Sequence, residues 1–387
     1  MPFLDIIATS AFGLESIVVR ELNKLGVEKT GVENGRISFQ GDYNTIVKSN
    51  IWLRCADRVL IKLASCRAYD FEDLFQGTLA VKWENFIPEN GMMHVIGKAV
   101  NSKLHSVPGC QSIVKKAIIE SMKRKYKKDQ FEENGSVYRI EIAMLNDMAT
   151  LTLDTSGAGL HKRGYREAQG EAPLKETLAA GLISLSRWRP ERVFADPMCG
   201  SGTIPIEAAL IGKNIAPGLI RSFSSEDWPE IPKSFWKTCR EEAKDSIRKE
   251  PMEIFASDID KRVLDAAIRN ADNAGVKDCI TFQHKPLSEF SSKKMFGAIV
   301  CNPPYGERMQ SEREVHELYR EMGRVFASLD SWSYFIMTSY DDFEKSFGKK
   351  ADKNRKLYNG KIRTYFYQYL GPLPSGNKSP VVPEPIT

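Results

Sequence analysis

The spacing of hydrophobic residues divides the first 155 positions into short strands alternating with amphipathic helices. Residues 5–10 and 35–40 form apolar runs typical of strands, whereas residues 14–25 carry apolar side chains at helical spacing. A second helix is predicted over residues 111–126. Further strands are predicted at residues 58–65, 93–100, 138–145 and 149–155. This half of the chain is therefore expected to be mixed α/β.

In the second half, short apolar runs end abruptly in polar residues and alternate with helical segments. The runs at 193–196, 254–258 and 298–301 are almost wholly apolar up to their last residue, which is typical of strands buried on both faces of a parallel sheet. Residues 355–369 alternate around Asn359-Gly360, a dipeptide that favours a type I′ turn. We therefore predict an open α/β sheet with an antiparallel hairpin at its edge.

The strand at 298–301 is followed directly by Asn302-Pro303-Pro304-Tyr305. The two prolines end the strand because neither can donate to a sheet ladder. The tetrapeptide is thus held at the carboxyl end of a strand, where open α/β sheets bind their ligands. The Asn302 side-chain oxygen and the Pro303 carbonyl oxygen can accept the two N–H bonds of an exocyclic amine, and Tyr305 can stack on the ring. Asn302, Pro303, Pro304 and Tyr305 are the predicted catalytic residues.

An amine on an aromatic ring is a poor nucleophile because its lone pair is delocalised into the ring. Two carbonyl acceptors stabilise the positive charge that develops on the nitrogen. Alignment with an activated methyl group lowers the barrier further by positioning the reactants. Taken alone, the tetrapeptide also fits a proline-rich turn after any buried strand.

A strand, a glycine loop and a helix follow one another from residue 193 onwards. Asp196 ends the strand, and Gly200 and Gly202 let the backbone approach a ligand closely, next to the free N–H groups of a helix N-terminus. The loop is GSG instead of GxGxxG, and the next acidic strand end, Asp258, comes 62 residues after Asp196 instead of about 20. A cofactor with an amino group and a ribose fits better than a dinucleotide, with Asp258 on the ribose hydroxyls.

Composition narrows the class of protein only moderately. A chain of 387 residues allows two or three domains, and a net charge of +5 permits a polyanionic partner without requiring one. Seven cysteines without a CxxC motif argue against a disulfide framework or a cysteine zinc site, and five histidines form no HExxH motif. No apolar run reaches the roughly 18 residues of a membrane helix. The acidic N-terminus lacks a basic leader, so a cytoplasmic location is expected.

These motifs carry a resemblance to a known family. Residues 190–370 resemble a class I S-adenosylmethionine-dependent methyltransferase, with DPMCGSGT as its cofactor loop and NPPY as its amino-methylating motif. The longer NPPYGER, together with HKRGYREAQGEAPLKETLAAGLI at 161–183, resembles the THUMP-domain RNA guanine methyltransferases. The likeness is greatest to the bacterial family containing large-subunit rRNA methyltransferase L, which modifies the 2-amino group of guanine. It covers the chain from near residue 1 to about residue 370.

The resemblance implies an α/β fold with a Rossmann-like methyltransferase domain, a mostly parallel seven-stranded sheet with a C-terminal antiparallel hairpin. An α+β region with a THUMP RNA-binding domain is expected to precede it. The expected divisions are a ferredoxin-like region at 1–60, the THUMP domain at 61–155, a linker and helix at 156–189, the methyltransferase domain at 190–370 and a disordered tail at 371–387. The insert at 215–251 is expected to cap the cofactor or contact substrate.

The resemblance also implies which residues bind S-adenosylmethionine. They are Asp196, Pro197, Cys199, Gly200, Gly202, Thr203, Asp258 and Ile259. In the family, the segment before the domain closes over the cofactor, which adds Leu174, Lys175 and Thr177, although a plain linker helix would explain these three equally well. Family members often place an acidic residue against the adenine after the third strand, where this chain has Gln283-His284-Lys285-Pro286. The adenine contact is therefore left open.

Cations gather towards the end of the helix at 111–126, with Glu120 as the lone acidic residue among them. Charge runs are usually solvated surface, and cations also suit the negative end of a helix dipole. The likeness to a THUMP domain favours RNA binding instead. The predicted RNA-binding residues are Lys98, Lys103, Lys115, Lys123, Arg124, Lys127 and, in the connector, Arg163.

The sequence therefore predicts an RNA methyltransferase that transfers a methyl group from S-adenosylmethionine to the 2-amino group of a guanine, by resemblance in 23S rRNA. It needs no metal because the sulfonium is already an activated electrophile. We expect a monomer that makes no contact with membranes. Three alternatives stay open: a tRNA guanine-N2 methyltransferase, a DNA adenine-N6 methyltransferase, and a non-enzymatic RNA-binding ribosome-assembly factor.

Overall fold

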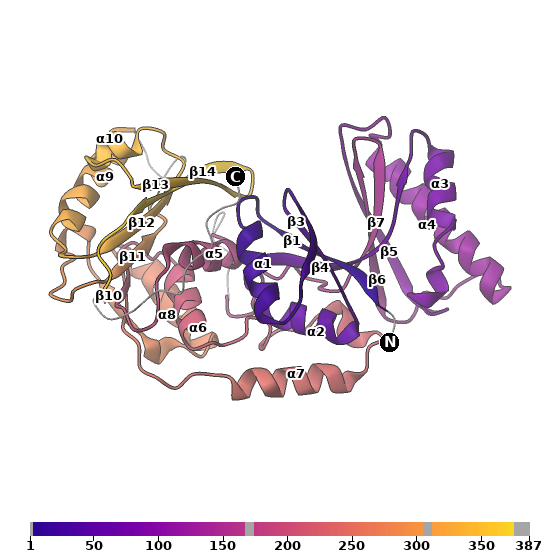
Figure 1. Ribbon diagram of the computed structural model, residues 1–387, viewed down its shortest axis with the longest axis horizontal. Helices are drawn as coiled ribbons and strands as arrows, with labels where there is room; N and C mark the ends of the chain where they lie inside the picture. The colour runs from indigo at the N-terminus through magenta and orange to yellow at the C-terminus, as the bar shows by residue number, and fades with distance from the viewer. Residues whose placement is uncertain (1–2, 167–173, 305–311, 375–387) are drawn as a thin grey trace. The chain divides into compact units, whose positions relative to one another are not determined.

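The computed structural model describes residues 3–166, 174–304 and 312–374 of the chain (Figure 1). The chain folds into two compact units, each built on its own seven-stranded sheet. The N-terminal unit comprises Met1–Gly164 and Ile215–Ile247, and the C-terminal unit comprises Tyr165–Asn214 and Arg248–Thr387. No helix in the described ranges is both long and apolar enough to cross a membrane.

The sheet of the N-terminal unit has the strand order β2-β3-β1-β4-β7-β6-β5, and only β5 and β6 run parallel. The strands are β1 (Leu4–Ser10), β2 (Lys29–Glu33), β3 (Arg36–Gly41), β4 (Ala56–Arg67), β5 (Met92–Val100), β6 (Val137–Leu145) and β7 (Met148–Asp154). The helices are α1 (Glu15–Lys24), α2 (Tyr43–Trp52), α3 (Phe71–Leu79), α4 (Val107–Tyr126) and α7 (Lys233–Asp245), with 3₁₀ turns η1 (Trp83–Asn85) and η2 (Ser224–Asp227). The predicted mixed α/β character is confirmed.

Helix α4 begins four residues before its predicted start at 111. Ser106 caps it by accepting a hydrogen bond from the Gly109 N–H at 3.3 Å. Pro108 lies in the first turn, where its missing N–H has no partner to lose. The N-cap and the proline are local start signals, so this boundary was recoverable from the sequence.

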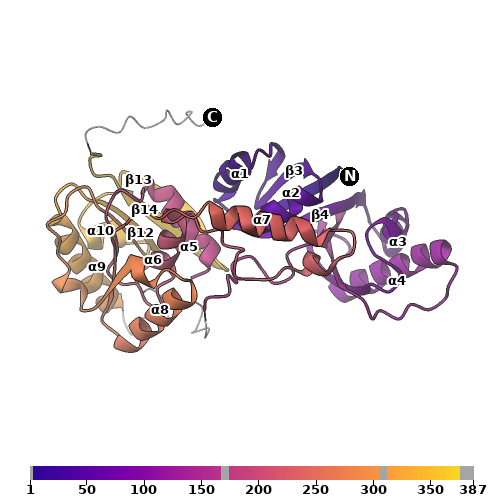
Figure 2. The same cartoon turned by 90° about the horizontal axis from the view of Figure 1, so that it is seen from below.

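The insert after α6 folds with the N-terminal sheet, which corrects the expectation of a continuous methyltransferase domain over 190–370. Helix α7 packs against α2 (Figure 2). Its Trp236 is 2% exposed and stacks on Phe223 with ring centroids 5.2 Å apart. Trp228 stacks on Tyr138 of β6 at 4.8 Å. The insert belongs to this unit because its aromatic side chains are buried there.

The sheet of the C-terminal unit has the order β10-β9-β8-β11-β12-β14-β13, parallel from β10 to β12 and closed by the antiparallel hairpin β13–β14. The strands are β8 (Phe194–Asp196), β9 (Ile254–Asp258), β10 (Ile280–His284), β11 (Ala298–Cys301), β12 (Ser333–Thr338), β13 (Lys353–Asn359) and β14 (Ile362–Tyr369). The helices are α5 (Glu176–Ser186), α6 (Thr203–Gly212), α8 (Lys261–Asn273), α9 (Glu312–Ala327) and α10 (Phe343–Phe347), with 3₁₀ turns η3 (Lys277–Cys279) and η4 (Leu287–Glu289). The expected class I methyltransferase sheet is confirmed.

Both faces of this sheet are covered by helices. Helices α5, α6 and α8 lie on one face, and α9 and α10 on the other (Figure 1). Every residue of β8, β11 and β12 is consequently buried, which explains their continuous apolar sequence. Polar groups on these strands can act only where the strands end.

The closing hairpin has a different turn from the predicted one. Asn359 pairs with Ile362, so the two central turn residues are Gly360 and Lys361. Only Gly360 has a positive φ, +63°. A positive φ at the first central position alone is the pattern of a type II′ turn, so the prediction of a type I′ turn over Asn359-Gly360 is wrong by one residue.

We expect Trp236→Ala to destabilise the N-terminal unit by about 3–5 kcal/mol, because it empties a buried site stacked on Phe223. Hydrogen–deuterium exchange should accelerate in α2 and α7 and stay unchanged in α5 and α6. Lys237→Ala, at a side chain that is 78% exposed, is the matched control. Equal loss of protection in α5 and α6 would contradict the assignment of the insert to the N-terminal unit.

Candidate active site

Three neighbouring parallel strands carry the candidate polar groups at their carboxyl ends. Asp196 ends β8 and Asp258 ends β9, while Asn302 follows Cys301 at the end of β11. The strand order β9-β8-β11 makes them adjacent, with Asp196 in register with Ala256 and Ile299 in register with Ala195. The structure thus brings together the three strand ends that the sequence singled out.

The glycine loop after β8 is fastened to the end of β9. Asp258 accepts hydrogen bonds from the Gly200 N–H at 2.8 Å and from the Asp260 N–H at 2.9 Å. The Cys199 N–H donates to the Ser257 carbonyl oxygen at 2.9 Å. Asn270 of α8 donates to the Ser201 carbonyl oxygen at 3.0 Å. Because both Asp258 oxygens already accept backbone donors, the loop and the carboxylate hold each other in place.

The two loop glycines serve different purposes. Gly202 has φ +82°, and a Cβ there would lie 2.9 Å from the Cβ of Ala267, so close packing against α8 requires glycine. Gly200 has φ +52°, and a Cβ there would meet no protein atom within 4 Å. The space beside Gly200 is therefore open, as a ligand that approaches the loop backbone requires.

Burial dominates the electrostatics of the first strand end. The Asp196 side chain is 1% exposed and accepts a hydrogen bond from the Met198 N–H at 3.2 Å. Burial, together with the negative charge of Asp258, raises the pKa of Asp196 well above its usual range. A buried carboxylate of this kind gains from a positively charged ligand. Pro197, which follows it, is also buried.

The two cysteines beside the site are buried fillers. Cys199 is 7% exposed and Cys301 is fully buried. Burial and then the neighbouring Asp196 carboxylate raise the pKa of both thiols well above the usual cysteine value. A raised pKa keeps a thiol protonated and unreactive, so neither residue is suited to act as a nucleophile.

The third strand end presents an unpaired acceptor. The Asn302 side-chain oxygen is buried and has no hydrogen-bond partner among the described residues. Pro303 is buried, and the Pro304 carbonyl oxygen accepts a long hydrogen bond from the Tyr319 hydroxyl at 3.5 Å. A buried carbonyl without a partner is costly, and an amine N–H of a bound substrate would satisfy it. Tyr305, predicted to stack on the substrate, lies outside the described residues.

The segment before α5 lies against the same glycine loop, within the C-terminal unit. Leu174 and Thr177 are 7% and 1% exposed, and Lys175 occupies the N-cap position of α5. Arg166, which the sequence reasoning missed, donates to Glu176, to the Leu174 carbonyl and to two loop hydroxyls. A basic residue in a connector gives no sequence indication that it will be buried.

An exposed apolar side chain follows Asp258. Ile259 is 71% exposed, and its carbonyl oxygen lies 2.9 Å from Nε2 of His284, the last residue of β10. The Lys285 N–H donates to the Asp258 carbonyl oxygen at 3.2 Å. An exposed isoleucine beside an acidic strand end offers an apolar surface for a flat ring.

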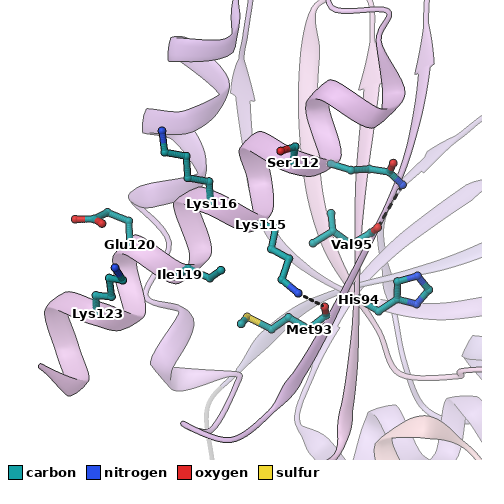
Figure 3. A pocket seen from close by; sticks show the side chains of 10 residues that line it. Met93, His94, Val95, Ser112, Lys115, Lys116, Ile119, Glu120 and Lys123 are labelled. Carbon is teal, nitrogen blue, oxygen red and sulfur yellow. Dashed lines mark hydrogen bonds between the residues drawn. The ribbon is translucent and has the colours of Figure 1, made fainter. Parts of the chain in front are cut away.

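Two of the predicted RNA-binding lysines, Lys115 and Lys123, line a cavity of about 610 Å³ between α4 and β5 in the N-terminal unit (Figure 3). The cavity is also lined by Met93, His94, Val95, Gln111, Ser112, Lys116, Ile119 and Glu120. Lys115 donates to the Met93 carbonyl oxygen on the edge strand β5 at 3.3 Å. The cavity thus combines an open sheet edge with positive charge.

Four of the predicted RNA-binding cations, including Lys115 and Lys123, form surface ion pairs. The pairs are Lys98 with Glu141 at 2.7 Å, Lys115 with Glu133 at 2.9 Å, Lys123 with Asp129 at 3.5 Å and Arg124 with Glu120 at 3.6 Å. Lys103 places its ammonium 4.7 Å from the Tyr69 ring centroid, and Lys127 ends α4 in the left-handed conformation. Exposed pairs contribute only about 0–1 kcal/mol, so a phosphate can compete for these cations.

Arg163 is different, and the structure contradicts its prediction as an RNA contact. Its side chain is 2% exposed and donates to the carbonyl oxygens of Leu160 at 2.8 Å and Arg54 at 2.5 Å. A buried guanidinium bonded to backbone carbonyls holds the connector in place and is not available to a polyanion.

The strand order of the C-terminal unit, with a glycine loop after β8 and Asn-Pro-Pro after β11, defines a class I methyltransferase domain. Family models match three segments: the RlmL ferredoxin-like domain at residues 5–60, the THUMP domain at 68–154 and the methyltransferase domain of RMKL-like proteins at 163–368. The chain belongs to the RMKL-like methyltransferase family. The predicted resemblance is confirmed.

Similar proteins extend over nearly the whole chain. The Bacillus subtilis protein YpsC, named as an RNA methyltransferase, is 51% identical over 367 residues, which cover 94% of this chain and 95% of YpsC. A Listeria monocytogenes structure described as an N6-adenine-specific DNA methylase is 49% identical, with a TM-score of 0.91 over 96% of this chain and 97% of its own. SMU.472, a methyltransferase solved in complex with SAH, is 43% identical, with a TM-score of 0.92 over 97% of this chain and 100% of its own.

We expect Asp196→Asn to change how the stability of the ligand-free protein depends on pH. A raised pKa means that the folded protein retains a proton that the unfolded chain has released. This stabilisation is complete below about pH 3.9, the pKa of an aspartate in the unfolded chain. It is lost as the pH rises through the pKa of Asp196 in the folded protein. The melting temperature of wild type should therefore fall relative to that of Asp196→Asn as the pH rises above about 4. If the melting temperatures of the two proteins changed with pH in parallel, a raised Asp196 pKa would be contradicted.

Proposed function

We propose that this RNA methyltransferase modifies the 2-amino group of a guanine in 23S rRNA, acting as a monomer in the cytoplasm. The single observation that carries the amine assignment is the buried, unpartnered side-chain oxygen of Asn302 at the end of β11. The assignment of RNA as the substrate has separate support, because a THUMP domain matches residues 68–154 and YpsC is named as an RNA methyltransferase.

S-adenosylmethionine is the cofactor. The family is one of methyltransferases, and SMU.472, 43% identical to this chain, was solved in complex with SAH. The residues around the glycine loop fit this molecule: open space beside Gly200, an acidic strand end at Asp258 and an exposed apolar side chain at Ile259. When bound, the cofactor supplies a methyl group on a positively charged sulfonium. The buried carboxylate of Asp196 favours a cationic ligand in this site.

The residues of this chain then act on the substrate amine through hydrogen bonding and orientation. Asn302 Oδ1 accepts one N–H of the amine, and we assign the second N–H to the Pro303 carbonyl oxygen. The two hydrogen bonds from the amine N–H groups to these oxygens stabilise the positive charge that develops on nitrogen during attack. The prolines restrict the backbone at this point, so the acceptors are held in position before the substrate arrives.

A guanine within a duplex must first leave its base stack. Flipping a base out costs a few kcal/mol, and an aromatic side chain can return about 1–3 kcal/mol by stacking on it. We assign the stacking role to Tyr305. The cations on α4 and around the α4–β5 cavity all belong to the N-terminal unit, and we assign them to the phosphate groups of the RNA.

A DNA adenine-N6 methyltransferase is the second candidate, because the Listeria structure with 49% identity is described in those words. The same Asn-Pro-Pro acceptors suit the 6-amino group of adenine. The THUMP domain favours RNA over DNA as the substrate. The tRNA alternative uses the same base and the same active-site chemistry.

The substrate is tested by transfer of labelled methyl groups from S-adenosylmethionine to total RNA and to DNA, followed by nucleoside analysis. We expect the label in 2-methylguanosine from the ribosomal RNA fraction. Label in the tRNA fraction would retain the base and overturn the rRNA assignment. Label in 6-methyladenine would overturn the base assignment.

Two substitutions should separate chemistry from cofactor binding. Asn302→Ala removes the amine acceptor and should lower turnover by roughly 100- to 1,000-fold, as the loss of a transition-state donor or acceptor does elsewhere. Its affinity for SAH should stay at the wild-type value. Asp258→Ala frees the glycine loop and removes the ribose contact, so SAH affinity should fall first. Calorimetry and single-turnover methylation measure the two effects, and equal losses of both in Asn302→Ala would mean that Asn302 is structural.

A further inference from the structure

Arg166 is a buried cation that joins three segments of the C-terminal unit. Its side chain is 9% exposed, and its Nε donates to Glu176 Oε1 at 3.0 Å. One Nη donates to Ser201 Oγ at 3.1 Å, and the other donates to Thr203 Oγ1 at 2.8 Å and to the Leu174 carbonyl oxygen at 3.4 Å. The segment before α5, the first turn of α5 and the glycine loop therefore share one guanidinium.

Only an arginine can make this set of contacts. Its planar fork presents five N–H groups at fixed angles, whereas the lysine ammonium is a single point with three donors. A buried charge is costly unless it is paired, and Glu176, whose side chain is 7% exposed, supplies the counter-charge. Burial raises the pKa of Glu176, and the positive charge of Arg166 opposes that rise. The attraction within the pair and its hydrogen bonds offset the cost of burial, and removal of either partner would leave an uncompensated buried charge.

The glycine loop needs such a support because its helix has no side-chain cap. Gly202 occupies the N-cap position of α6 and has no side-chain oxygen to accept from the N–H groups of the first turn. On the α8 side, Asn270 holds the Ser201 carbonyl oxygen at 3.0 Å. On the α5 side, Arg166 holds the hydroxyls of Ser201 and Thr203. The loop is thus fixed from both sides, by its backbone on one and by its side chains on the other.

We propose that Arg166 is a positioning residue for the S-adenosylmethionine loop. It holds Ser201 and Thr203 in the conformation that admits the cofactor, and it ties this loop to the segment at 174–176 in the same step. Thr203 then contributes by accepting from Arg166, and not by touching the cofactor. This inference rests on the proposed cofactor site at the glycine loop.

A double-mutant cycle with SAH as the probe tests the assignment. Arg166→Met keeps the length of the side chain and removes its donors, while Thr203→Val keeps the shape and removes the hydroxyl. We expect each single variant to weaken SAH binding by roughly 10- to 100-fold, the range for losing hydrogen bonds to a charged group. In the Arg166→Met background, Thr203→Val should have almost no further effect. A full, additive loss in the double variant would mean that Thr203 contacts the cofactor directly, and would overturn the proposed role.

Loss of folding must be separated from loss of loop geometry. Arg166→Met leaves Glu176 buried without its partner, so Arg166→Met/Glu176→Gln is the variant that keeps the charge balanced. We expect this double variant to unfold within a few degrees of wild type without ligand and still to bind SAH weakly. Wild-type SAH affinity in it would overturn the proposal. Arg313→Met, at a side chain that is 88% exposed on α9, is the matched control and should bind SAH as wild type does.

A small-molecule rescue distinguishes positioning from general stability. In Arg166→Gly, added methylguanidinium should restore SAH affinity towards wild type, whereas methylammonium should not. Absence of rescue in a folded Arg166→Gly protein would contradict the proposal. Asp258→Ala distinguishes a wrong positioning role for Arg166 from a wrong assignment of the cofactor site. If Asp258→Ala weakens SAH binding and Arg166→Met does not, only the positioning role is wrong; if neither does, the loop is not the cofactor site.

Discussion

The hydrogen bonds from the Gly200 and Asp260 N–H groups to the Asp258 carboxylate, at 2.8 and 2.9 Å, are the contacts on which the site depends. The first bond joins the loop after β8 to the end of β9, and the second holds the carboxylate in place at that strand end. Parallel pairing of β8 with β9 and β11 then places Asp196 and Asn302 at the same sheet edge. Together with the hydrogen bonds that Cys199, Asn270 and Arg166 make to the loop or from it, this connection restricts the conformations open to a glycine-rich segment. The carboxylate therefore shapes the loop, in addition to the ribose contact that we propose for it.

The site holds polar groups that folding alone would not favour. Asp196 is 1% exposed with a raised pKa, and Asn302 carries a buried oxygen without a described partner. Both conditions cost stability in the free protein. In the proposed complex, a cation would relieve the first and an N–H donor would relieve the second. Both groups are buried, so bulk water does not relieve them instead. The two groups lower the stability of the ligand-free protein, a cost that is common at functional sites.

Features that follow from strand periodicity were predictable from the sequence. Carboxyl ends of parallel strands meet at one edge, so the order of residues along the chain was enough to group Asp196, Asp258 and Asn302. Features that depend on tertiary contacts were not predictable in this way. Arg163 and Arg166 differ by three positions and look alike in sequence, yet each is buried in a different unit. The insert lies within the methyltransferase sequence but folds with the N-terminal sheet, where its Trp228 stacks on Tyr138 of β6.

The most direct test of the central claim is the amount of 2-methylguanosine in 23S rRNA from cells that lack this chain, measured by mass spectrometry of digested nucleosides. We expect that one methylated guanine disappears, returns with the wild-type chain and stays absent with a folded chain carrying Asn302→Ala. An unchanged 2-methylguanosine content in the deleted cells would contradict it. So would recovery of the modification with the Asn302→Ala chain, because the unpartnered oxygen of Asn302 would then have no part in methyl transfer.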